Sequence, residues 1–377
     1  MTAAIPGTPP ENGSAFARLA LLGYALLIVY ASWYPFTGWQ SNGLPPLGFL
    51  SSPLPHYWTG FDVTTNVVAY VPFGMLLVFA LYPLLRGVLA LLLVLVAAVL
   101  WSGTMEAVQT FLPTRVPSNL DLLTNVAGAV TGGVLGLLSS GFFLQQSRLL
   151  QVRQRWFSHE ASRGLLVVCA WPLAQIYPQG YLFGQGQLTP LLSETLSDLA
   201  GRPIDLFSVL WPGLRLSAEE FWLSETIITA FGMTGAVLTL LCLLRKQAPL
   251  WTLMLLTIML ALAAKSMASA LLFGPENAFV WLTPGARGGL LLSVLMLACL
   301  QFSSRLAQRR AAVLMLLISL LTVNLIPPNP YFVVTLQSWV QGKFLSFNGA
   351  AQFLSLLWPF FALWFLLHPV HRNRAKV

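Results

Sequence analysis

Residues 87–100, GVLALLLVLVAAVL, contain only apolar side chains and glycine, so a helix formed by this segment has no face suited to water. About twenty such residues are long enough to cross the hydrocarbon core of a bilayer as a helix. Only 8% of the 377 residues are charged, whereas soluble proteins carry about 25%. The charges are too few to cover a water-soluble surface, and the sequence therefore predicts an all-α polytopic membrane protein.

The sequence predicts ten membrane-spanning helices. They cover roughly residues 16–35, 62–82, 87–111, 119–142, 163–178, 219–244, 249–273, 277–302, 311–328 and 347–367. Most basic residues then fall in segments that place both termini in the cytoplasm, as the positive-inside rule expects. The net charge of +8 is therefore interpreted as an orientation signal beside anionic lipid, and no nucleic-acid partner is expected.

We expect the chain to contain two membrane regions and their connections. These are a cytoplasmic N-terminal tail (1–15), a four-helix membrane domain (16–143), a basic cytoplasmic loop (144–162), a second four-helix region (163–302) with an outer amphipathic segment (179–218), and two last helices with a basic cytoplasmic tail (303–377). A shift of 162 residues aligns LWSGTMEAVQTFLP (100–113) with LAAKSMASALLFGP (262–275), which favours a 4+4+2 parallel repeat with a degenerate second copy. Chance similarity between apolar segments is the alternative.

The second region adds two expectations of its own. TPLLSETLSDLAG (189–201) predicts an amphipathic helix on the membrane surface, with Thr189 as its N-cap, and a passive connector or a lid over a site are the alternatives. Ser217 and Glu220 predict a capping box at the start of the sixth span. Glu225, Lys265 and Arg287 are expected to form a structural ion pair, or else to extend an anion-binding surface.

Polar residues gather on one face of each of three successive spans. Helical spacing groups Asp62, Asn66 and Tyr70; Ser102, Glu106 and Gln109; and Asp121 and Asn125. Glycines at 128, 132 and 136 continue the third group and would let another helix approach closely. Because a charge at the bilayer centre costs about 2.5–3.5 kcal/mol on insertion scales, we expect an outward-facing polar pocket between these spans. A purely structural clasp is the alternative.

The residue types suggest separate roles. Carboxylates suit general acid–base chemistry, so the candidate catalytic residues are Glu106 first, then Asp121 and Asp62. Arg115, held between two prolines, is suited to a phosphate. The full set of candidate substrate-binding residues is Asn66, Gln109, Arg115, Asn125, Tyr70 and Ser118. No histidine joins the acids, and neither a metal nor a cofactor is expected.

The polar pattern resembles the VanZ-like family over roughly residues 15–140. It consists of Asp62-x3-Asn66, Pro72-Phe73-Gly74, Glu106-x2-Gln109-x3-Pro113-x-Arg115 and Asp121-x3-Asn125-x2-Gly128-x3-Gly132, and Tyr34-Pro35-Phe36 also fits. Ser118 departs from the pattern, since family members often have an acid there. The resemblance implies a multi-pass protein of the bacterial cytoplasmic (inner) membrane with a role in the cell envelope. For the founding member, it implies resistance to glycopeptide antibiotics such as teicoplanin.

The leading hypothesis is an envelope protein whose pocket recognises, and in one version processes, a lipid-linked or anionic intermediate. The expected partners are membrane lipids, in particular a polyprenyl-phosphate-linked glycan or an anionic phospholipid headgroup. As an enzyme, it would be an acid–base hydrolase or transferase acting on a glycan or headgroup. A transporter or lipid flippase that uses the intramembrane acids, and a non-catalytic envelope binding or scaffold protein, are the alternatives.

Overall fold

A computed structural model describes residues 14–34, 36, 38–43, 45–144, 152, 154–158, 161–213, 216–327 and 345–368. Within these ranges the regular structure is helical, apart from an isolated bridge between Phe157 and Leu244. Seven helices are long and apolar enough to cross a membrane, and three shorter apolar helices accompany them. Each predicted span overlaps one of these helices, so the prediction of an all-α polytopic membrane protein is confirmed.

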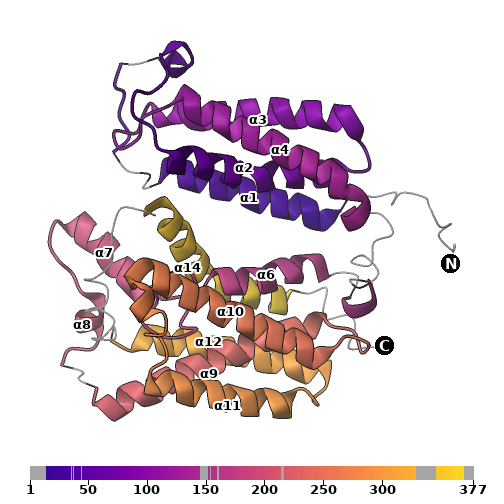
Figure 1. Ribbon diagram of the computed structural model, residues 1–377. Coiled ribbons are helices and arrows are strands. Elements are labelled where there is room, and N and C mark those ends of the chain that lie inside the picture. Colours follow the sequence, from indigo (N-terminus) through magenta and orange to yellow (C-terminus); the bar gives the residue numbers. More distant parts are fainter. Residues whose placement is uncertain are drawn as a thin grey trace. The chain divides into compact units, whose positions relative to one another are not determined.

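The chain forms two compact units, unit 1 (1–155) and unit 2 (156–377). In unit 1, four helices run alongside one another: α1 (Ala15–Trp33), α2 (Gly60–Leu81), α3 (Gly87–Gln109) and α4 (Asn119–Leu144) (Figure 1). Unit 2 contains α6 (Ala161–Leu173), α7 (Thr189–Ala200), α8 (Leu206–Leu210), α9 (Ala218–Leu243), α10 (Leu250–Phe273), α11 (Pro284–Leu300), α12 (Arg305–Leu325) and α14 (Leu345–Leu367). Most of the two predicted tails, most of the loop 144–162, and Pro35 lie outside the described residues.

Glycines bring α2 and α4 into direct backbone contact. A Cβ atom at Gly132 would lie 1.9 Å from the carbonyl oxygen of Val71, and one at Gly74 would lie 1.8 Å from that of Ala129. A Cβ atom added at Gly128 would lie 2.2 Å from the carbonyl oxygen of Val67. Only glycine fits such distances, so the predicted close approach along the glycine stripe is confirmed. It also sets the polar N-terminal turns of α2 and α4 side by side.

In unit 2, α9 is the most deeply buried helix, with contacts to α6, α10, α11, α12 and α14. The fifth predicted span, 163–178, is too long, because α6 already ends at Leu173. Pro172 lacks an N–H group and cannot continue the helical hydrogen bonding. Residues 174–186 then follow, which are not helical but are largely buried.

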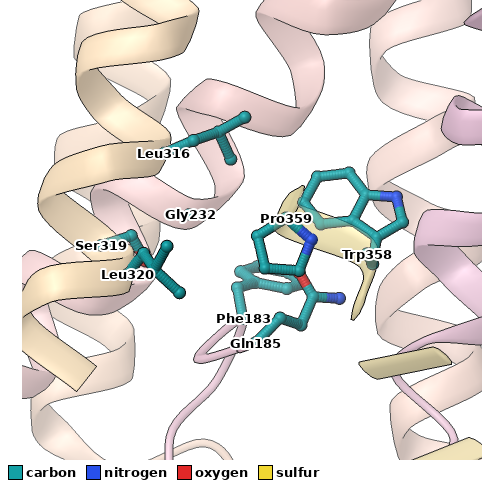
Figure 2. Close-up of a pocket in the computed structure, with 8 residues that line it drawn as sticks. All are labelled: Phe183, Gln185, Gly232, Leu316, Ser319, Leu320, Trp358 and Pro359. Carbon is teal, nitrogen blue, oxygen red and sulfur yellow. The ribbon is translucent and has the colours of Figure 1, made fainter. Parts of the chain in front are cut away.

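This buried segment, 174–186, contacts the middle of two helices, α9 and α14. Thr229 of α9 donates to the carbonyl oxygen of Leu182 (3.1 Å), and the amide of Gly186 donates to the carbonyl oxygen of Ser355 in α14 (3.1 Å). Such partners are required, because backbone at membrane depth cannot find water. Figure 2 shows a small cavity beside the segment, lined by Phe183, Gln185, Gly232, Leu316, Ser319, Leu320, Trp358 and Pro359.

Three predicted helix starts in unit 2 need correction. The span predicted from residue 277 begins at Pro284, because Thr283 caps α11 by accepting from the amide of Ala286. The span predicted from residue 311 already begins at Arg305, because Ser304 caps α12. Thr189 is the first residue of α7 rather than its N-cap, since its hydroxyl group contacts Asn324 instead. The capping box of Ser217 and Glu220 is confirmed.

The predicted ion pair in unit 2 is wrong. Glu225 hydrogen-bonds to Thr283 and to the backbone of Gly285, at the N-terminus of α11. Lys265 is buried, and its Nζ atom lies 3.5 Å from the carbonyl oxygen of Tyr177. Arg287 is exposed. The free amides of a helix N-terminus favour negative charge, so they replace a cation as the partner of Glu225.

Candidate functional site

The polar cluster of unit 1 is organised around the turn between α3 and α4. Glu106, in the last turn of α3, is only 3% exposed, and its Oε2 atom accepts a hydrogen bond from the amide of Ser118 (2.9 Å). The Ser118 hydroxyl in turn accepts from the amide of Asp121 (3.2 Å). Glu106 therefore lies at the N-terminus of α4, where the unpaired amides and the helix dipole stabilise a carboxylate. This contact joins the end of α3 to the start of α4.

Arg115 binds the end of α1. Its Nη2 atom donates to the carbonyl oxygens of Ala31 (3.2 Å) and Tyr34 (3.0 Å), and Gln109 donates to that of Ser32 (3.2 Å). The last carbonyls of a helix have no partner within it, and a cation there is favoured by the dipole. Burial lowers the pKa of Arg115 and the Glu106 carboxylate opposes that shift, but an arginine remains charged at physiological pH.

Asp62 has a local partner that the sequence analysis missed. It is the third residue of α2, and its Oδ2 atom accepts from the amide (3.2 Å) and the hydroxyl (2.7 Å) of Thr59. The Thr59 hydroxyl accepts from the amide of Asp62 (3.1 Å), which completes a capping box. The signal was present in the sequence as Thr59-x-x-Asp62. Asp62 is nevertheless exposed.

Three acceptor side chains meet where α2 and α4 begin. Asn66, one turn beyond Asp62, makes a side-chain hydrogen bond to Asp121 in the first turn of α4. The charge of Asp62 also acts on Asp121, so the two carboxyl groups are neighbours. Asn66 and Asp121 are half-buried. Asp62, Asn66 and Asp121 therefore form an accessible polar group at the starts of α2 and α4, and we call them the acidic mouth.

A buried layer lies behind the acidic mouth. Asn125 of α4 donates to the hydroxyl of Ser102 in α3 (3.0 Å), and Tyr70 of α2 lies near the same hydroxyl. These three side chains are at most 6% exposed, and the Tyr70 hydroxyl and the Asn125 Oδ1 atom make no hydrogen bond of good geometry. Tyr70 and Asn125 thus belong to the interior of the bundle, whereas the acidic mouth is accessible at its surface.

The loop between α1 and α2 also contacts the site, which the sequence analysis did not anticipate. The side chain of Asn42 donates to the carbonyl oxygen of Thr110 (3.4 Å), and the amide of Gln40 donates to that of Phe111 (3.0 Å). Asn119, at the start of α4, donates to the carbonyl oxygen of Ser52 (2.6 Å). Most of these contacts use backbone carbonyls, so no residue pattern could have revealed them.

The chemistry of the acidic mouth is that of hydrogen-bond acceptors. Carboxylates and an amide oxygen accept from hydroxyl, ammonium and amide groups. Among the residues that the structure describes, no group of three or more His, Cys, Asp or Glu side chains could hold a metal ion. The acceptors of the acidic mouth therefore suit a ligand that carries hydrogen-bond donors.

Residues 19–140 match the model of a family described as VanZ/LLP1. The match contains every candidate site residue from Asp62 to Asn125 and ends within α4. It confirms the VanZ-like resemblance for this part of the chain, which is thus a VanZ-like domain. No curated protein and no solved structure matches the chain.

Proposed function

We propose that the VanZ-like domain recognises the polar headgroup of a lipid-linked or anionic intermediate of the bacterial cell envelope, in the cytoplasmic (inner) membrane. The observation that carries this proposal is the acidic mouth at the N-terminal ends of α2 and α4. Both helices are long enough to span a bilayer, so their ends lie at the level of lipid headgroups. A ligand that stays in the bilayer, such as a polyprenyl-phosphate-linked glycan or an anionic phospholipid, can reach the mouth laterally.

The acceptors and the cation of the site suit two different parts of a ligand. Asp62, Asn66 and Asp121 accept hydrogen bonds from the hydroxyl, amine or amide groups of a headgroup. Arg115 brings a positive charge next to Glu106, and this charge favours a phosphate at the same level. An envelope lipid that joins a phosphate to a sugar or peptide carries both kinds of group.

Binding explains the site with fewer assumptions than catalysis. One oxygen of Glu106 is held by the amide of Ser118, and the side chain is buried behind the acidic mouth. A hydrolase or transferase would need the ligand to penetrate to this carboxyl group. Recognition needs only the accessible acceptors of the acidic mouth. Binding of an envelope precursor there would make it less available to a lipoglycopeptide antibiotic.

The packing of α2 against α4 argues against a transporter or flippase. Such a protein needs a polar path from one membrane face to the other. Below the acidic mouth, the backbones touch at Gly128, Gly132 and Gly74, which leaves no space for a path between these two helices. We therefore favour a headgroup-binding protein.

The test is to purify the full chain from bacterial membranes in lipid nanodiscs and to identify enriched lipids by mass spectrometry. We expect enrichment of a glycan-linked or anionic lipid, and a loss of about tenfold or more in Asp121→Asn, since a hydrogen bond to a charged group contributes about 1.5–3 kcal/mol. Asp198→Asn, which removes an exposed acid of unit 2, is the matched control. The proposal fails if the wild type enriches no lipid, or if Asp121→Asn retains the same lipid.

A further inference from the structure

Helix α7 presents chemically different faces, and one of them holds α8. Ser193 accepts a hydrogen bond from the amide of Leu206 (3.0 Å), and Ser197 accepts from the amide of Ile204 (2.8 Å). Residues four apart lie on the same side of a helix, so the two serines form one ridge. This ridge folds the chain back on α7, and we call residues 189–210 the α7–α8 hairpin.

A second face of α7 is apolar and exposed. Leu192, Leu196 and Leu199 share one side of the helix, with exposed fractions of 47%, 38% and 80%. In α8, Val209 and Leu210 are also exposed. Removing such a side chain from water contributes about 1.5–3 kcal/mol, so each of these five side chains favours an apolar environment.

The first turn of α7 is fixed to the end of a membrane-spanning helix. The Oδ1 atom of Asn324 accepts from the amides of Leu188 (2.7 Å) and Thr189 (3.2 Å), and its Nδ2 atom donates to the carbonyl oxygen of Gly186 (2.8 Å). Asn324 lies in the last turn of α12, whose 21 residues extend about 31 Å, the thickness of the hydrocarbon core. The hairpin therefore begins at a membrane–water boundary.

The other end of the hairpin leads back to the same boundary. Gly232 of α9 lies against Ser319 of α12, and Gly235 lies against Leu316, so residue numbers rise in one helix as they fall in the other. The two helices are antiparallel, and the start of α9 lies at the level where α12 ends. Figure 1 shows α7 and α8 at one end of the unit 2 helices.

Tryptophan and charge point to the same environment. Trp211 follows α8 and stacks on Phe207 with 5.6 Å between ring centroids, and Trp222 in the second turn of α9 is 50% exposed. Tryptophan is enriched at membrane interfaces. Residues 189–220 contain five acids and two bases, which excludes the usual attraction of a basic helix to anionic lipid.

We infer that the α7–α8 hairpin lies in the membrane interface, with the leucine face of α7 and the apolar end of α8 inserted at the boundary between headgroups and acyl chains. The burial of apolar side chains, rather than charge, holds the hairpin in the interface. Because the chain enters membrane spans on both sides of the hairpin, no basic residues are needed to recruit it from solution. Its contact with lipid is therefore independent of anionic lipid, and it does not rest on the function proposed for unit 1.

The test uses the full chain with its three cysteines replaced by alanine, reconstituted in phosphatidylcholine vesicles. A cysteine introduced as Leu199→Cys is labelled with the environment-sensitive dye NBD, and Asp198→Cys on the neighbouring polar face is the matched control. We expect blue-shifted emission from the label at position 199 and at least twofold stronger quenching by lipid spin-labelled near the headgroup. The result should not change when phosphatidylglycerol is added.

Three outcomes would overturn the inference. Equal quenching at both positions would mean that the leucine face is not selectively in contact with lipid. A blue shift at position 199 without quenching would mean that protein, such as a second copy of the chain, covers this face. Quenching that requires phosphatidylglycerol would show an electrostatic attachment. Since Leu199 is 80% exposed, neither variant disturbs the packing of unit 2, and Leu196→Cys provides an independent repeat.

Discussion

Gly132→Ala tests the helix contact on which the site depends. The added Cβ atom would lie 1.9 Å from the carbonyl oxygen of Val71 and 2.9 Å from its Cα atom, and both are backbone atoms that cannot rotate away. Ordinary carbon–oxygen contacts lie near 3.4 Å, so α2 and α4 must separate by roughly 1.5 Å. Overpacking of a tight contact costs about 1–3 kcal/mol. The separation would also weaken the hydrogen bond between Asn66 and Asp121.

The assay is the thermal unfolding midpoint of the purified full chain in a mild detergent, together with the amount of lipid that co-purifies. We expect Gly132→Ala to lower both. Gly103→Ala is the matched control, because an added Cβ atom there meets nothing within 4 Å and alanine favours a helix by up to about 1 kcal/mol. If Gly132→Ala is as stable as Gly103→Ala, the backbones of α2 and α4 are not in contact. The acidic mouth is then not positioned by this contact.

The remaining predictions concern single polar side chains. Glu106→Gln keeps an acceptor for the amide of Ser118 and should change the unfolding midpoint little. Glu106→Leu leaves that amide unpaired and should lower the free energy of unfolding by about 1–3 kcal/mol. Equal midpoints of the two variants would contradict this contact. Arg115→Lys should lower the midpoint, because an ammonium group cannot reproduce the geometry of a guanidinium bound to two carbonyls, and an unchanged midpoint would show that charge alone suffices. Lys265→Met should raise the unfolding midpoint, since it replaces a buried amine, whose Nζ atom lies 3.5 Å from the carbonyl oxygen of Tyr177, by an apolar side chain, and a loss of stability would show that this polar contact outweighs the cost of burial. Ser217→Ala should cost about 1 kcal/mol in thermal unfolding by removing the cap of α9, and no loss would mean that the capping box contributes nothing.

The positions of the spans could be predicted because the bilayer imposes both length and composition. In unit 1, polar and turn residues mark the helix ends, and α1 to α4 begin and end within two residues of the prediction at every boundary. The buried segment 174–186 could not be predicted. Its proline, glycines and glutamines are typical of a loop, which would ordinarily lie at the surface, and only its tertiary contacts with α9 and α14 show that it is buried.

The members of the polar cluster could be predicted by helical periodicity, but their partners could not. Periodicity shows that Asp62, Glu106 and Asp121 lie on particular helix faces, and it does not show what each carboxyl group contacts. Arg115 demonstrates the difficulty, since its partners are carbonyl oxygens at the end of α1, about eighty residues earlier in the chain. Any residue can supply a carbonyl, so the sequence contains no signal for this contact.

Helix N-termini lie beside four described acids, and Arg115 adds a positive charge next to one of them, Glu106. Glu106 and Asp121 lie at the start of α4, Asp62 at the start of α2, and Glu225 at the start of α11. A helix N-terminus stabilises an anion without covering it, whereas an ion pair would occupy its oxygens. The carboxyl oxygens of Asp62 and Asp121 can therefore remain accessible, which is what headgroup recognition requires.

The same arrangement bears on the predicted repeat. A shift of 162 residues places Asp121, in the first turn of α4, on Thr283, the N-cap of α11. Asp121 is contacted by Asn66 of α2, and Thr283 by Glu225 of α9. Helices α2 and α9 both begin with a capping box. The capping boxes lie 158 residues apart rather than 162 (217 − 59), and the repeat stays a prediction. Glu225 is only 4% exposed, whereas Asp121 is half-buried, so this arrangement in unit 2 presents no accessible acid.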